Sequence, residues 1–179
     1  MYYPCYRRGF LFCTMKRSLL LLFFLMVAVF LLLRWQGNVL VTPASSRGIL
    51  DLEFAGNTLR LYQLKLFWNA SDVNNNIYLD FLFIAAYTAF LMGACQWVSE
   101  KSRHTKRAEW FTRIALAAGI FDIVENLLML VAWNDGAGNG AMKLIYYCAA
   151  IKFLLAGLVV LYLMYSLPVL LRKRKGLPN

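Results

Sequence analysis

Two acids and an amide interrupt a long apolar run in the second half of the sequence. Asp122, Glu125 and Asn126 lie within residues 114–133, which are otherwise apolar. At about 100° per residue, these three side chains share one face of a helix. Ionisable side chains inside an apolar run of this length are typical of a ligand-binding or proton-handling site within a membrane.

One base can meet these acids. Lys152 lies inside the last apolar run, and the glycine-rich segment 134–140 that separates the two runs is short enough to make their helices antiparallel neighbours. At a rise of about 1.5 Å per residue, the depths of Lys152, Asp122 and Glu125 then agree to within about one helical turn. We therefore expect an ion pair between Lys152 and either Asp122 or Glu125. Asn126 is expected to satisfy leftover hydrogen-bonding capacity.

The cost of inserting these acids predicts that their helix does not face lipid on all sides. Insertion scales assign roughly 2.5–3.5 kcal/mol to each central carboxylate and return about 0.3–0.6 kcal/mol for each Leu, Ile, Phe or Val. The ten such residues in the run return about 3–6 kcal/mol, against about 5–7 kcal/mol for the two acids if both are ionised. The polar face must therefore meet protein or water.

Two interpretations of this polar face remain open. It is either a buried network that fixes how the third and fourth helices pair, since buried polar groups can specify register, or a ligand-binding or proton-handling site. The candidate residues, for a site or a network alike, are Asp122, Glu125, Asn126, Lys152, Asp80, Tyr87 and Glu53.

Motifs that would indicate an enzyme are missing from the sequence. It contains no HExxH, GxSxG or GxGD motif, and its single histidine, His104, lies in a polar segment. Paired carboxylates can act as acid and base, but nothing in the sequence sets their separation. The four cysteines form no CxxC pair, and Cys95 and Cys148 lie inside apolar runs. We therefore expect no catalytic residue, no metal site, no disulfide framework and no cofactor.

The composition is that of a membrane protein. Hydrophobic residues make up 61% of the chain and charged residues 16%, whereas soluble domains have about 45–50% and about 25%. The net charge of +10 does not indicate a nucleic-acid partner, because the basic residues cluster in short segments beside apolar runs. The expected partner is the lipid bilayer, with a homo-oligomer or a larger membrane complex as further possibilities.

The apolar runs predict an all-α polytopic membrane protein, with four transmembrane helices in an antiparallel bundle and one short amphipathic surface helix. The segments are a cytoplasmic tail at 1–17, transmembrane helices at 18–34, 77–98, 111–133 and 142–171, an external segment at 35–76 that holds the amphipathic helix at about 58–68, a basic cytoplasmic loop at 99–110, an external hairpin at 134–141 and a basic tail at 172–179. Lysine and arginine are concentrated in the two tails and in the 99–110 loop. This distribution predicts a multi-pass protein of the cell membrane with both termini on the cytoplasmic side. Residues 18–33 also fit the apolar region of a long signal peptide, so cleavage of the first helix stays an alternative.

Two further patterns lie outside the central run. Residues 49–54 (ILDLEF) alternate apolar and acidic side chains with period two, and the amphipathic piece that follows carries Leu61, Leu64, Lys65 and Trp68 on one side. We expect this piece to lie at the outer leaflet over the bundle, with Glu53 close to its start. In the helix expected at 77–98, a stripe of small residues, Ala85, Ala89 and Gly93, lets a second helix approach closely.

Four short blocks of the sequence resemble, in the same order, a group of small bacterial integral membrane proteins with no known activity. The blocks are LDLEFAG, DFLFIAAY, DIVEN and the Lys-Phe pair in the last run, and the resemblance covers roughly residues 48–165. It implies a four-helix protein of the bacterial inner membrane. It draws attention to Asp51, Glu53, Asp80, Asp122, Glu125, Asn126 and Lys152, and it implies no substrate or cofactor.

Together these features predict a non-enzymatic protein that binds a small ligand or a lipid, senses a signal or assists transport through a polar site on the third and fourth helices. The alternative is a structural or assembly subunit whose polar face docks a larger membrane partner. An intramembrane enzyme that uses carboxylates is a third possibility.

Overall fold

A computed structural model describes residues 6–101 and 105–174 of the chain, with side chains for residues 17–101 and 106–166. The outermost parts of the two expected tails, residues 1–5 and 175–179, and the centre of the basic loop with His104 lie outside the described residues. Within them the fold is all-helical, with no strand and one isolated β-bridge between Thr42 and Ser45.

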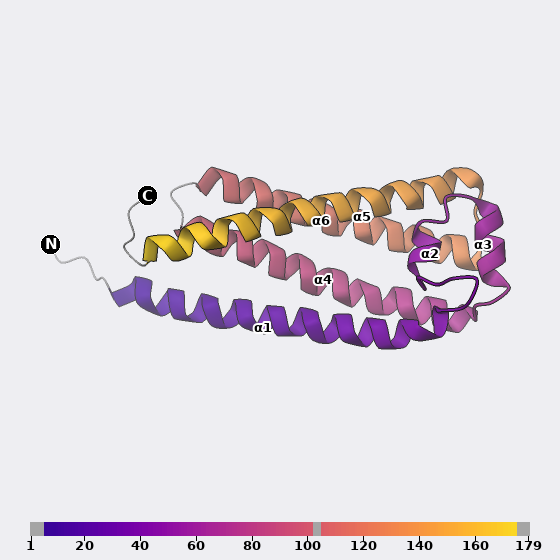
Figure 1. Cartoon of the computed structure of the whole chain (residues 1–179), viewed down its shortest axis with the longest axis horizontal. Coiled ribbons are helices and arrows are strands. Elements are labelled where there is room, and N and C mark those ends of the chain that lie inside the picture. Colours follow the sequence, from indigo (N-terminus) through magenta and orange to yellow (C-terminus); the bar gives the residue numbers. More distant parts are fainter. Residues whose placement is uncertain (1–5, 102–104, 175–179) are drawn as a thin grey trace.

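Four long helices make up most of the described chain (Figure 1): α1 (Tyr6–Gly37), α4 (Ala70–Lys101), α5 (Thr105–Asn134) and α6 (Asn139–Arg174). The segments that are long and apolar enough to cross a membrane are Arg17–Leu40, Ala70–Lys101, Lys106–Asn134 and Asn139–Ser166. Four such helices indicate a multi-pass membrane protein.

The helices extend past the apolar runs from which they were predicted. The helix expected at 77–98 begins at Ala70, where the Asn69 side chain accepts a hydrogen bond from the Ser71 backbone N–H at 3.0 Å. The amphipathic helix is α3 (Thr58–Lys65), and the Asn57 side chain caps it by accepting from the Arg60 N–H at 2.8 Å. Side-chain caps of this kind set where a helix begins, whereas apolar length sets only the minimum that a span requires.

The long helices pack in sequence order. α1 contacts α4, α4 contacts α5, and α5 contacts α6. The amino-terminal end of α1 and the carboxy-terminal end of α6 lie at one end of the molecule in Figure 1, and the shorter helices lie at the other. Only 6% of the apolar segment of α1 is buried, compared with 33%, 39% and 28% for α4, α5 and α6, so α1 is the most peripheral of the four.

The chain between α1 and α4 forms a cap over one end of the bundle. It contains a 3₁₀ turn, η1 (Asn38–Leu40), then α2 (Leu50–Glu53) and α3. The period-two segment 49–54 is thus largely the helix α2, whose residues Asp51, Leu52 and Glu53 are all buried. Gly48 and Gly56, with φ of 61° and 65°, lie on either side of α2 and take a left-handed conformation that other residues rarely adopt.

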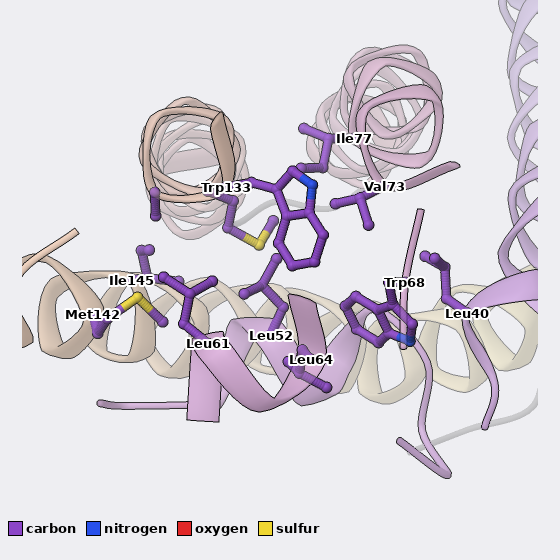
Figure 2. Close-up of a cluster of buried hydrophobic side chains, with 12 residues drawn as sticks. Leu40, Leu52, Leu61, Leu64, Trp68, Val73, Ile77, Trp133, Met142 and Ile145 are labelled. Carbon is purple, nitrogen blue, oxygen red and sulfur yellow. The ribbon is translucent and has the colours of Figure 1, made fainter. Parts of the chain in front are cut away.

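A hydrophobic cluster joins this cap to the bundle (Figure 2). Leu61 and Leu64 of α3 are fully buried, and burying each leucine side chain contributes about 1.5–3 kcal/mol. The apolar side of α3 therefore packs on the bundle and on neighbouring parts of the cap. The cluster comprises Leu40, Leu52, Leu61, Leu64, Trp68, Val73, Ile77, Met129, Ala132, Trp133, Met142 and Ile145.

Small residues allow α4 to approach its neighbours. A Cβ atom at Gly119 of α5 would lie 2.5 Å from Thr88 Oγ1 of α4, so a larger residue would force the two helices apart. The stripe expected on α4 is divided between two surroundings. Gly93 lies against leucines of α1, whereas Ala85 and Ala89 line an apolar groove of about 310 Å³ between α4 and α5.

Candidate functional site

Lys152 of α6 is enclosed by carboxyl groups from two other helices. Its Nζ lies 2.7 Å from Asp122 Oδ1 and 2.9 Å from Glu125 Oε2, both on α5. It also lies 3.4 Å from Glu53 Oε2, which α2 contributes. Both acids named as alternative partners therefore contact the lysine, and Glu53 adds a third. We call Glu53, Asp122, Glu125 and Lys152 the acid–lysine cluster.

Local sequence explains how α5 and α6 build their share of the cluster. Asp122 and Glu125 are separated by three positions, so both project from one face of α5. The short connection between α5 and α6 makes these helices neighbours. On α6, Cys148 and Ala149 are also buried, and their small side chains leave room for the acids beside Lys152.

Two polar side chains of α4 extend the cluster. Tyr87 donates its hydroxyl hydrogen to Asp122 Oδ2 at 2.8 Å. Asn126 of α5 donates from Nδ2 to Asp80 Oδ2 at 2.7 Å. The structure thus brings together, between α2, α4, α5 and α6, all the residues named as site candidates: Asp122, Glu125, Asn126, Lys152, Asp80, Tyr87 and Glu53.

The cluster is buried and holds more hydrogen-bond acceptors than donors. Glu125 has no exposed surface, and Glu53, Asp122 and Lys152 are each about 5–6% exposed. Glu53 Oε2 and both carboxyl oxygens of Glu125 accept no hydrogen bond. The contact between Lys152 and Glu125 is therefore an ion pair that contains no hydrogen bond. Leaving buried acceptors unpaired typically costs about 1–3 kcal/mol each, so this arrangement is expensive for a purely structural network.

Glu53 differs from its partners because it belongs to the cap and not to a span. Burial raises the pKa of the Glu53 carboxyl; Lys152 opposes this shift and Asp122 adds to it. The charge state of the cluster therefore depends on whether α2 keeps Glu53 in the protein interior.

Several residues that hold α2 in place were not singled out from the sequence. Arg47 Nη2 lies 2.8 Å from Asp51 Oδ1, so Asp51, which the resemblance pointed to, anchors the cap and does not touch Lys152. Phe54 stacks on Phe153 of α6 with ring centroids 6.0 Å apart, and Lys152 Nζ lies 5.1 Å from the centre of the Phe153 ring. The available signal was adjacency, because Phe54 follows Glu53 and Phe153 follows Lys152.

Among the residues whose side chains are described, no three histidine, cysteine or acidic side chains are placed to hold a metal ion. Comparisons with protein-family models, curated proteins and solved structures find no match for the chain.

Proposed function

We propose that this chain is a non-enzymatic multi-pass membrane protein that binds a small hydrogen-bond-donating ligand at the acid–lysine cluster. The observation that carries the proposal is the set of buried carboxyl oxygens around Lys152 that lack a donor. Such oxygens are stabilised by anything that brings a hydrogen to them, and fully satisfied groups are the rule inside proteins.

The position of Glu53 supports a binding role over simple helix pairing. Asp122 and Glu125 already supply two counter-charges for Lys152 from the neighbouring helix. A third acid, brought in by a separate short helix, adds charge that packing does not need. Because α2 contributes Glu53 to the site and packs against α3, filling or emptying the cluster can change how the cap sits, which is how a sensor would report its ligand.

The orientation that we propose is an antiparallel bundle in the bacterial inner membrane, with both termini in the cytoplasm and the cap outside. Only this arrangement puts all the basic segments on the same side of the membrane, the cytoplasmic side. Reporter fusions after residues 70 and 138 should be external, and fusions after 104 and 179 cytoplasmic. An external signal from the fusion after residue 104 would show that the proposed orientation is wrong.

A second candidate function, an assembly subunit, is favoured by the outer side of the cap. Leu59, Tyr62, Leu66 and Phe67 are 59–82% exposed although they lie outside the membrane-spanning segments. Exposed apolar patches of this kind mark interaction surfaces.

Purification in a mild detergent, without cross-linker, separates the two functions. For a binding protein we expect a discrete monomer or small homo-oligomer whose thermal unfolding responds to a panel of ammonium compounds, alcohols and lipids. A ligand present at 100 times its Kd should add about 2.7 kcal/mol to the unfolding free energy. Glu125→Gln should abolish the response, while Asp135→Asn, at an exposed position, should retain it. A stable hetero-complex that responds to no ligand would instead indicate an assembly subunit.

A further inference from the structure

We infer that the ligand of the acid–lysine cluster is a proton, held between the carboxyl groups of Glu53 and Glu125. This inference rests on the proposed function and names its ligand. It also assigns the two ends of the proton site to different parts of the fold, one to the cap and one to a membrane-spanning helix.

The geometry of the two glutamates carries the inference. Both carboxyl groups contact the same ammonium, because Glu53 Oε2 lies 3.4 Å and Glu125 Oε2 lies 2.9 Å from Lys152 Nζ, and both oxygens of Glu125 and Oε2 of Glu53 are buried without a donor. Two carboxylates that face each other away from water repel, and such pairs hold one proton between them because both cannot stay ionised. The missing donor is therefore supplied by protonation of one glutamate, whose O–H then donates to the other.

The polar groups around the glutamate pair already have hydrogen-bond or ion-pair partners of their own. On α6, Lys152 makes its hydrogen bond to Asp122 at 2.7 Å. On α4, Tyr87 donates to Asp122, and Asp80 takes its hydrogen bond from Asn126. On the cap itself, Asp51 is paired with Arg47.

The charges of the cluster also favour one bound proton. Glu53, Asp122 and Glu125, when ionised, oppose the single ammonium of Lys152, which leaves a net charge of −2 on the cluster. One proton on the glutamate pair reduces this to −1 without moving any heavy atom. Neighbouring Asp80 adds a further acid and no compensating base.

A proton fits the site better than a larger donor does. Glu125 is fully buried and Glu53 is 5% exposed, so the carboxyl groups are in contact with packed protein. The apolar groove between α4 and α5 is lined by none of the cluster residues. A proton needs no cavity, and it can exchange with the outside when α2 carries Glu53 towards the surface.

Infrared spectroscopy of the purified full chain in lipid nanodiscs tests the inference. At pH 7 the parent should show the carbonyl band of a protonated carboxylic acid, shifted in D₂O, which disappears as the pH is raised. Because the proton is shared, Glu53→Gln and Glu125→Gln should each remove the same band, whereas the control Asp135→Asn should leave its intensity unchanged.

Each other outcome decides against the inference. If the band is missing from the parent at pH 7, no proton is held there, and this result does not depend on whether the variants fold. If the band survives in either glutamine variant, the proton belongs to another group. An ammonium compound that stabilises a parent lacking the band would leave the proposed binding function intact and overturn only the proton.

Discussion

Lys152→Met is expected to lower the free energy of unfolding by about 3–5 kcal/mol, because it removes the one positive charge that three buried carboxyl groups share. Asp122 loses an ion pair of 2.7 Å, and Glu53 and Glu125 lose their only nearby cation among the described side chains. The effect should appear as a sharply lower yield of folded protein and a lower midpoint of thermal unfolding in detergent.

A second change in the same cluster should restore much of that loss. In Lys152→Met with Asp122→Asn, the acid that makes the shortest contact becomes neutral, and its amide can still accept the hydrogen bond from Tyr87. Lys143→Met is the matched control, because Lys143 lies exposed on the same helix and is expected to change stability by less than about 0.5 kcal/mol. A Lys152→Met protein as stable as the parent would mean that the ion pairs contribute nothing to folding.

Much of the helical architecture could be predicted from the sequence because apolar length alone decides which segments can cross a membrane. Helix ends could not be predicted in the same way. The start of α4 depends on a cap at Asn69, and that of α3 on Asn57, and both are local hydrogen bonds that a hydropathy pattern does not contain.

Part of the candidate site could likewise be predicted from the sequence, and part could not. The contact of Lys152 with Asp122 and Glu125 follows from the short connection between α5 and α6 and from the similar depths of these residues along the two helices. Both can be counted directly in the sequence. The contact with Glu53 does not, because it requires α2 to fold back onto the bundle. That return depends on left-handed glycines beside α2, on the Arg47–Asp51 ion pair and on the packing of Phe54 against α6, none of which a period-two pattern indicates.

The cap should loosen as the pH rises. When α2 is docked, burial raises the pKa of Glu53 above its ordinary value of 4.5, whereas undocking returns the carboxyl to water. Above pH 4.5 the undocked state therefore binds fewer protons than the docked state, so docking is strongest at low pH and weakens until the pH passes the docked pKa. Within that window the ratio of undocked to docked cap can rise by up to about tenfold per pH unit.

Thiol labelling of α3, which packs against α2 in the cap, reports this opening. Leu64→Cys places a thiol where the parent side chain is fully buried, and Gln63→Cys places one on the exposed side of the same helix, so the ratio of their labelling rates cancels the pH dependence of thiolate chemistry. Mass spectrometry of the labelled peptide excludes signal from the native cysteines. We expect the ratio to increase with pH in the parent background and to stay flat with Glu53→Gln, since the amide remains neutral whether α2 is docked or free. A flat ratio in the parent background, or an equal rise with Glu53→Gln, would show that the protonation of Glu53 does not control the cap.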